Sequence, residues 1–206
     1  CLVGSEMCIR DRNNYLNLKL ENANLKRENL DLKIKLNSTF KDSSINYYKG
    51  EYKFKIADIV SNSIKYSKNF LIINKGLNDS VKLDDGLITS EGIIGIINQV
   101  SPKYSTAISI LNSDLKINAK IKRTNHFGSL QWNGKNHKIM TLYDIPKSAN
   151  IKINDSVVSG GMSFIFQENI PIGQIKNIDK NKICINVKIG NINLNWLLNN
   201  IIEKWI

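Results

Sequence analysis

The sequence contains few of the residues that build metal and redox centres. Its 206 residues include two histidines and three cysteines. Cys1, Cys8 and Cys184 have neither the even number of a disulfide framework nor the spacing of metal ligands. His126 and His137 are too few for a metal site unless carboxylates join them, and nothing places them at ligand spacing. No glycine-rich phosphate loop precedes a helix. We therefore expect no metal and no cofactor.

Long apolar runs are also missing. The sequence has no stretch of 18 apolar residues, the length that a membrane-spanning helix needs. It does not begin with Met, and residues 1–12, CLVGSEMCIRDR, share neither the composition nor the periodicity of the rest of the chain. We interpret residues 1–12 as non-native sequence. We expect the native N-terminus, with any anchor, to lie upstream.

Positive charge is abundant but dispersed. The net charge of +11 comes from lysines spread over the whole chain, without an arginine cluster. Such a charge favours binding to anionic surfaces, including nucleic acid and acidic lipid headgroups. Binding to single strands would need aromatic and basic residues on one strand face. Residues 52–55, Tyr-Lys-Phe-Lys, come closest, but alternation puts the aromatic rings on one face and the lysines on the other. A basic nucleic-acid-binding barrel is therefore kept only as an alternative.

Residues 15–39 follow a seven-residue repeat with leucine at d and asparagine recurring at a. This pattern is typical of a parallel two-stranded coiled coil, because a buried asparagine is satisfied only by the matching asparagine of a partner in register. Glutamates at g and lysines at e would add contacts between the helices. We predict a dimer interface along the a and d positions Tyr15, Leu18, Asn22, Leu25, Asn29, Leu32 and Leu36.

The alternative for this segment is an amphipathic helix packed on its own domain. Leu16, Leu20, Leu30 and Ile34 lie off the a and d positions and permit that arrangement. At 1.5 Å per residue the segment is only about 37 Å long. We expect an upstream continuation or the membrane to help two copies associate.

From residue 51 onward the pattern changes to short strands separated by turn residues. Alternation at 52–57 and 117–121, and apolar runs at 71–73 and 93–97, predict strands. Asn133-Gly134 predicts a hairpin turn between two further strands. Because no helical window interrupts these strands, they indicate a sandwich or barrel.

Two eight-residue segments resemble each other. Residues 82–89, KLDDGLIT, align with residues 152–159, KINDSVVS, and an Ile-Gly strand comes after each segment. Hairpins in general resemble one another, but the aligned match favours two related β units. Residues 51–206 are long enough for two small barrels.

Two features are candidates for binding a partner. Trp132 stands next to the predicted turn, where it either faces solvent as a hot spot or lies across a barrel mouth. The connection 162–169 holds Phe164, Ile165 and Phe166, and an apolar loop either plugs a barrel or contacts a partner. Both alternatives stay open for each feature.

A pair of barrels also suggests the trypsin-like architecture, which needs a serine, a histidine and an aspartate in contact. Neither His126 nor His137 lies in a protease motif. Residues 161–164, Gly-Met-Ser-Phe, lack the second glycine of an oxyanion-hole turn. Fold analogy does not confer activity. We therefore predict no catalytic residues and keep a hydrolase as the weaker alternative.

The order of motifs resembles the MreC family of rod shape-determining proteins, in its Bacteroidetes-like branch. The similarity covers residues 15–206. After the heptads it rests on the segments INKG (73–76), NDSV (78–81), GIIG (92–95), SPKYS (101–105), LNSD (111–114), GSLQWNG (128–134), LYDIP (142–146), VVSGG (157–161) and IPIG (170–173). The family often has Gly where Ser80 stands, and Pro and Gly where Gln167 and Asn169 stand.

The resemblance implies a non-enzymatic, dimeric and sometimes filament-forming scaffold of the bacterial cell-elongation machinery. It implies an inner-membrane anchor and a periplasmic location. It also implies MreD, MreB, the glycosyltransferase RodA and the elongation transpeptidase as partners, with no nucleic acid.

We therefore predict a mainly β protein with an N-terminal helical coiled coil, in which two small β-barrels follow a dimeric stalk. The expected divisions are residues 13–48 for the stalk, 49–120 for the first barrel and 121–206 for the second. The first barrel is allowed to be discontinuous and to include C-terminal strands.

Overall fold

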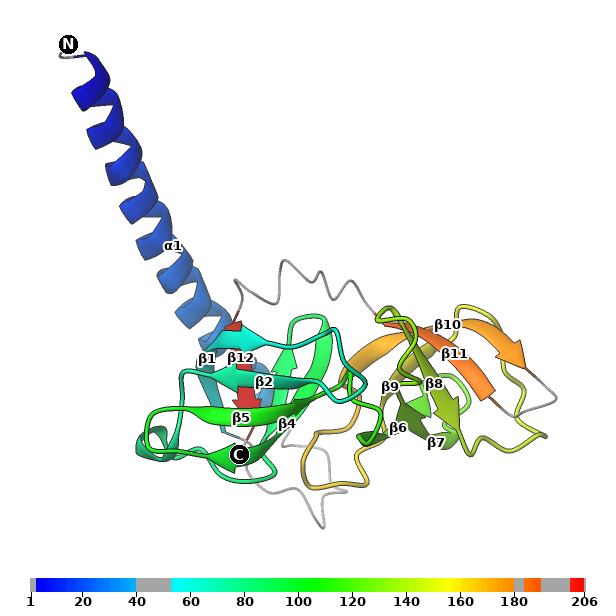
Figure 1. Ribbon diagram of the computed structural model, residues 1–206. Coiled ribbons are helices and arrows are strands. Elements are labelled where there is room, and N and C mark those ends of the chain that lie inside the picture. The colour runs from blue at the N-terminus through cyan, green and yellow to red at the C-terminus, as the bar shows by residue number, and fades with distance from the viewer. Residues whose placement is uncertain (1–2, 40–52, 180–183, 190–200, 206) are drawn as a thin grey trace. The chain divides into compact units, whose positions relative to one another are not determined.

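A computed structural model describes residues 3–39, 53–179, 184–189 and 201–205 (Figure 1). The chain divides into two units, Cys1–Gly50 and Glu51–Ile206. None of the helices within the described residues is long and apolar enough to span a membrane.

The first unit contains one helix, α1 (Val3–Thr39). Its 37 residues correspond to about 55 Å at 1.5 Å per residue. The helix begins at Val3, so it runs through most of the segment that we interpret as non-native from its sequence. The predicted stalk boundary at residue 48 lies outside the described residues.

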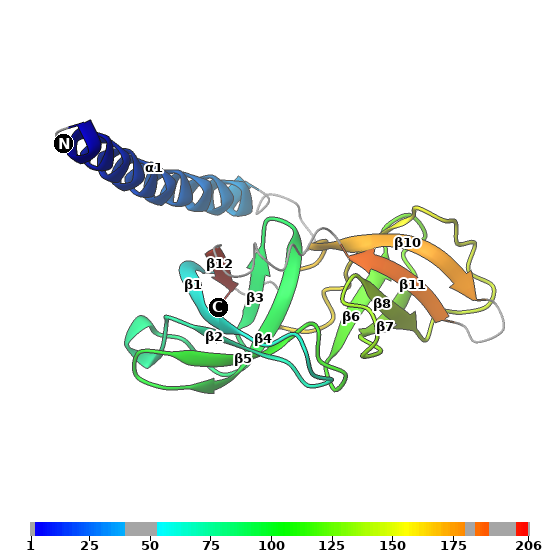
Figure 2. The same cartoon turned by 45° about the horizontal axis from the view of Figure 1, so that its top comes forward.

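The second unit consists of two closed barrels of six strands each. The first has the cyclic order β1-β12-β3-β4-β5-β2, and Figure 2 shows β12 between β1 and β3. Its strands are β1 (Phe54–Asn62), β2 (Phe70–Ile73), β3 (Gly86–Thr89), β4 (Gly92–Val100), β5 (Ser105–Ser109) and β12 (Ile201–Trp205). A short 3-10 helix, η2 (Leu77–Asp79), lies between β2 and β3.

The second barrel has the cyclic order β10-β11-β8-β7-β6-β9. Its strands are β6 (Lys116–Ile121), β7 (Phe127–Gln131), β8 (Ile139–Tyr143), β9 (Ser156–Ser159), β10 (Pro171–Asp179) and β11 (Cys184–Ile189). The expected division after residue 120 falls inside β6, so the chain passes from one barrel to the other between Ser109 and Lys116. The first barrel is discontinuous, because β12 comes after all strands of the second.

Alternating apolar residues produce these strands by burying one face. In β2, Leu71 and Ile73 are fully buried while Phe70 and Ile72 are partly exposed. The strands predicted at 71–73, 93–97 and 117–121 are confirmed as parts of β2, β4 and β6. The predicted hairpin is also confirmed, since β7 and β8 pair in antiparallel register and Gly134 in their connection has a φ of 78°.

Two hydrophobic cores stabilise the unit. A smaller core fills the first barrel, with Leu71, Ile73, Leu87 and Ile97 at its centre. The larger core fills the second barrel and continues into residues from β3, β4 and the chain after β5, namely Ile88, Ile93, Ile110 and Leu111. The two barrels therefore share apolar contacts.

The repeated segments of the sequence occupy equivalent places in the two barrels. Asp85 accepts a hydrogen bond from the backbone N–H of Lys82, at 2.5 Å, and Asp155 accepts one from that of Lys152, at 2.9 Å. The preceding residues, Asp84 and Asn154, have φ of 65° and 69°. The prediction of two related β units is thereby confirmed.

The equivalence extends to all six strands. Gly95 stands opposite Leu87 and Ser109, and Gly173 stands opposite Val157 and Ile189. When the two cyclic orders are aligned at these glycines, each strand of the first barrel has an equivalent in the second. The equivalent strands are β3 and β9, β4 and β10, β5 and β11, β2 and β8, and β1 and β7. The remaining strand of the first barrel, β12, corresponds to β6. The barrels thus have one strand order, but the strand that begins the second barrel is the last strand of the first.

Candidate functional site

The described part of α1 exposes apolar side chains along its predicted interface. Tyr15, Leu18, Leu25 and Leu32 are all exposed. Leu16, Leu20 and Ile34, which lie off that interface, are exposed as well. Exposure alone therefore does not separate the coiled-coil interpretation from its alternative. The side chain of Leu36 lies outside the described residues.

The two asparagines at a share one conformation. Nδ2 of Asn22 donates to the carbonyl oxygen of Leu18, and Nδ2 of Asn29 donates to that of Leu25, both at 2.9 Å. Each bond uses one N–H of the side-chain amide. This bond does not involve the second N–H or the Oδ1 of the amide. In a parallel dimer, these two atoms would form hydrogen bonds with the matching asparagine of the other helix.

A loop between β9 and β10, residues 160–170, is held to the second barrel by several polar contacts. We call it the Phe164 loop. The Ser159 hydroxyl donates to the carbonyl oxygen of Gln167 at 2.5 Å and accepts from the N–H of Ile170 at 2.8 Å. Glu168 forms an ion pair with Lys120 of β6, whose side chain is 7% exposed. Both ends of the loop are therefore fixed to the barrel.

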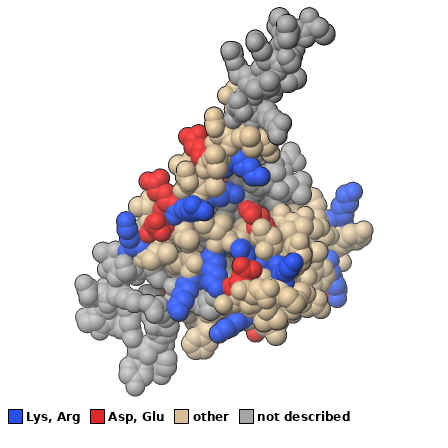
Figure 3. Space-filling model, turned by 90° about the vertical axis from the view of Figure 1, so that its left-hand side faces the viewer, with Lys and Arg blue, Asp and Glu red and all other residues tan. Residues whose placement is uncertain are grey.

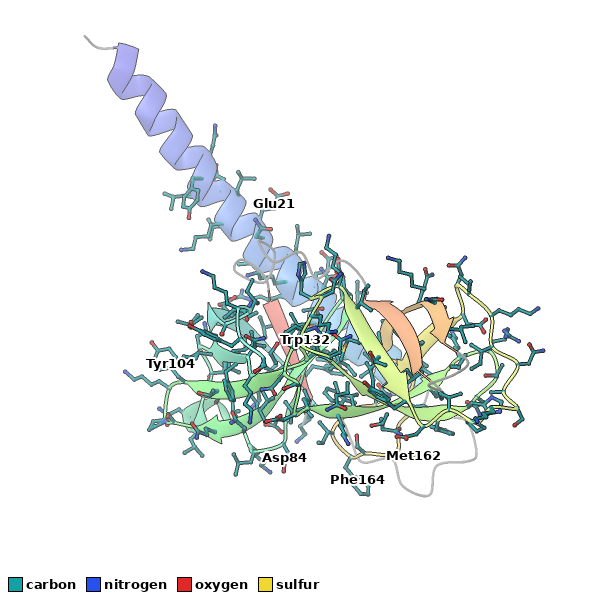
Figure 4. The ribbon with its side chains drawn as sticks, turned by 45° about the vertical axis from the view of Figure 1, so that its right-hand side comes forward. Glu21, Asp84, Tyr104, Trp132, Met162 and Phe164 are labelled. Carbon is teal, nitrogen blue, oxygen red and sulfur yellow. The ribbon has the colours of Figure 1, made fainter. Side chains whose placement is uncertain are left out.

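The apolar residues of this loop divide into two groups. Phe166 is 3% exposed, and Ile165 is half-buried and packs against the larger core. A Cβ atom added to Gly86 of β3 would lie 2.5 Å from the Phe166 ring, so this ring contacts the first barrel. Phe164 is 86% exposed and projects from the loop (Figure 4). Met162 is also exposed.

The structure therefore corrects part of the predicted partner site. Phe166 is buried, so it plugs the space between the barrels rather than contacting a partner. Trp132 is 4% exposed, and its Nε1 donates to the carbonyl oxygen of Asn136 at 2.9 Å. Of the two alternatives for Trp132, the structure favours the buried one, because the connection after β7 folds back and covers the indole. Of these side chains, Phe164 alone is available to another protein over most of its surface.

One ion pair ties together two turns at an end of the second barrel. Arg123 donates from Nε and Nη2 to the two carboxylate oxygens of Asp155, both at 2.7 Å, and from Nη2 to the carbonyl oxygen of Asn150 at 2.6 Å. The hydrogen bonds from Arg123 hold the pKa of Asp155 below its usual value, although burial opposes the shift. The pair stabilises the turn that begins β9.

The histidines show no catalytic arrangement. Nδ1 of His126 is buried without a hydrogen-bond partner among the described residues, so no carboxylate orients this ring through it. His137 lies in the connection between β7 and β8. The described residues also contain no group of three or more histidine, cysteine, aspartate or glutamate side chains that could hold a metal ion.

Charge is mixed over the surface in view. Figure 3 shows basic and acidic side chains interspersed on one face rather than separated into patches of one sign. Ion pairs agree with this, since Lys68, Lys75 and Lys120 each contact an acidic side chain.

The sequence gives no local signal for the contacts that hold the Phe164 loop, although Ser159 lies in the segment VVSGG (157–161). Lys120 is separated from its partner Glu168 by 48 positions. The departure at Asn169 has a structural counterpart, because this residue has a φ of 70°, which asparagine tolerates better than most residues. The N–H of Asn169 donates to the carbonyl oxygen of Ser159 at 3.1 Å.

The strand orders define a protein of two equivalent, closed β-barrels preceded by a long helix. Residues 59–194 match the family model of the rod shape-determining protein MreC, barrel core. The chain belongs to this family.

Relatives of known name agree with the assignment. The chain is 30% identical over 169 residues to the cell shape-determining protein MreC of Listeria monocytogenes, covering 81% of the chain and 55% of that protein. It is 24% identical over 156 residues to MreC of Haemophilus influenzae, covering 76% of the chain and 42% of that protein. The chain thus spans about half the length of these relatives.

Solved structures share the fold. MreC from Listeria monocytogenes superposes with a TM-score of 0.68 at 23% identity, covering 93% of each chain. MreC from Pseudomonas aeruginosa gives 0.64 at 18% identity, covering 74% of this chain and 98% of the other. A complex between penicillin-binding protein PBP2 and MreC from Helicobacter pylori gives 0.58 at 19% identity, covering 75% of this chain and 98% of the other.

Proposed function

We propose that the chain is part of a dimeric, non-enzymatic scaffold that maintains rod cell shape by organising peptidoglycan-synthesis enzymes in the periplasm. Membership of the MreC family carries this proposal, because the curated relatives are named as cell shape-determining proteins. One similar structure is described as the major periplasmic domain of a cell shape-determining filament. An anchor in the inner membrane, upstream of α1, is part of the proposal.

Pairing through α1 gives the scaffold its mode of action. Leucine at d and asparagine at a favour two parallel helices in register. Two joined copies present every surface twice, so weak contacts to wall-synthesis enzymes gain avidity without any new contact. Partners of this scaffold would be an elongation transpeptidase, RodA, MreD and MreB. The transpeptidase has support from the complex of PBP2 with MreC of Helicobacter pylori.

The pairing is tested by placing charges on the d positions. Leu25→Lys with Leu32→Lys puts four lysines into a paired interface, so the intact protein, anchor included, should sediment as a monomer at micromolar concentration. In the bacterium that encodes the chain, this variant should replace rods by rounded cells. The matched control is Leu20→Lys with Ile34→Lys, which adds the same charge away from the a and d positions.

Two outcomes would contradict pairing through α1 or its role in cell shape. A double d-position variant that still sediments as a dimer would place the interface elsewhere. Normal rods with a strictly monomeric variant would show that pairing is not needed for the role in cell shape.

Phe164 is the proposed contact for a wall-synthesis enzyme. Its ring is exposed on a loop that is fixed at both ends, so little conformational entropy is lost when the ring docks on a partner. Phe164→Ala should weaken binding of the intact protein to the elongation transpeptidase by about tenfold or more, as measured by biolayer interferometry.

Ile153→Ala is the matched control, because Ile153 is an exposed apolar residue in another turn of the same barrel. Its affinity should stay within about twofold of the unmodified protein. Equal affinities of both variants and the parent would exclude the Phe164 loop as the contact.

A further inference from the structure

The strand β12 differs from the other strands of the first barrel in how the chain reaches it. The strands β1 to β5 succeed one another directly along residues 54–109. Between β5 and β12 the chain builds the whole second barrel, and residues 190–200 then join Ile189 to Ile201. The chain therefore enters β12 from the second barrel and not from another strand of the first.

The place that β12 fills is a defined slot between β1 and β3. Phe54 to Asp58 of β1 stand opposite Trp205 to Ile201, and Leu87 and Ile88 of β3 stand opposite Lys204 and Glu203. The equivalent strand β6 has the same registers, since Ala119 stands opposite Gly128 while Lys120 and Ile121 stand opposite Val158 and Val157. The two equivalent strands therefore pair with both of their neighbours in the same register.

Without β12, the first barrel would have two open edges. Backbone N–H and C=O groups of β1 and β3 would lose their ladder partners, and such edges accept an added strand of matching register. The buried Ala57 and Leu87, which stand opposite Ile202 and Lys204, would lose their cover on that side. An empty slot would therefore accept a strand that pairs with both edges in the register of β12.

We propose that this slot takes β12 from a second copy of the chain as well as from its own, so that two copies exchange the strand. The contacts in the slot are the same in both cases, which is the condition under which strand exchange costs little. The connection 190–200 reaches at most about 40 Å when fully extended. The inference rests on the proposed pairing through α1, which would hold a second slot at high effective concentration.

The test is a disulfide that can form only between copies. Cys1, Cys8 and Cys184 are first replaced by serine in the full chain. One tagged copy then carries Ile56→Cys and a differently tagged copy carries Glu203→Cys, two positions that stand opposite each other in the β1–β12 ladder. After co-expression and oxidation, we expect a covalent species that holds both tags on a denaturing, non-reducing gel.

A matched pair in the second barrel controls for random contact. Lys116 and Gln131 stand opposite each other in β6 and β7, which adjoin in sequence and have no separate connection to exchange. Lys116→Cys and Gln131→Cys on different copies should give no more than background cross-linking. A single chain with both Ile56→Cys and Glu203→Cys should close internally, which shows that the geometry permits the bond.

The outcomes separate this inference from the proposed function. Sedimentation of the reduced samples reports pairing by itself. A dimer without mixed-tag cross-links overturns strand exchange and leaves the paired scaffold standing, whereas a monomer contradicts the scaffold as well. Failure of the single chain to close internally would overturn the slot. Mixed-tag cross-links that persist with Leu25→Lys and Leu32→Lys would show exchange without help from α1.

Discussion

Asp85 and Asp155 close the same turn in the two barrels, each by accepting an N–H from the residue three positions earlier. Both are buried or nearly so, and both come after a residue with positive φ. Asp155 also binds Arg123 through both carboxylate oxygens. Charge on this carboxylate therefore contributes to the stability of the second barrel.

The ion pair predicts a defined pH dependence. Because the folded-state pKa of Asp155 is lowered, its contribution is fully present above the unfolded value of about 3.9 and is lost as the pH falls through the lower folded value. Asp155→Asn should lower the urea midpoint at pH 7 and flatten the decline in stability below pH 4. Urea titrations between pH 7 and pH 2.5 measure both effects.

Asp84→Asn is the control for this prediction, because it removes the same charge from the equivalent turn of the first barrel and asparagine tolerates a φ of 65°. Its stability should run parallel to that of the unmodified protein over the whole pH range. Parallel curves for Asp155→Asn as well would mean that the Arg123 pair contributes nothing.

Individual side chains are harder to predict from the sequence than strands. Phe164 and Phe166 are two residues apart in one apolar loop, yet one is exposed and the other buried. The Phe166 ring packs beside Gly86 of a distant strand, which leaves room for it, and local sequence carries no information about that contact. The burial of Trp132 escapes prediction for the same reason, since proximity to a turn does not determine burial.

At the scale of elements, alternation at 52–57 and 117–121 and apolar runs at 71–73 and 93–97 located β1, β6, β2 and β4, because each strand buries one face in a barrel. The helix begins earlier than predicted, at Val3. The Phe164 loop is recognisable as an apolar connection, but the ion pair that anchors it joins Lys120 to Glu168, 48 positions later.

The contact of this loop with β3 is open to measurement. A Cβ atom on Gly86 would lie 2.5 Å from Phe166 Cε1 and 3.0 Å from the carbonyl oxygen of Ile165. Gly86→Ala should therefore destabilise the protein by about 1–3 kcal/mol in urea unfolding. Combined with Phe166→Ala, its cost should fall well below the sum of the two single changes, because the clash is relieved.

Gly134→Ala provides the comparison. Gly134 has a φ of 78° and no atom within 4 Å of an added Cβ, so its substitution strains the backbone without touching Phe166. The loss of unfolding free energy caused by Gly134→Ala should add to the loss caused by Phe166→Ala. Additive costs for Gly86→Ala too would argue against packing of the ring on β3.

At the scale of the whole molecule, the resemblance and the repeat of residues 82–89 in 152–159 predicted two related barrels. The repeat is visible because its aspartate turns and Ile-Gly strands are local features. The correspondence of β12 with β6 is not visible, because five residues of a strand carry too little pattern to identify a partner strand in another barrel. Pairing of two copies stays a prediction, since it depends on a second chain.

The position of β12 after the whole second barrel in the sequence has a consequence for protein synthesis. A chain emerging from the ribosome can complete the second barrel while the first still lacks one strand. During that interval β1 and β3 are unpaired edges, a state that favours association with neighbouring nascent chains. Quality control in the cell would therefore have to protect this half-finished barrel longer than its completed neighbour.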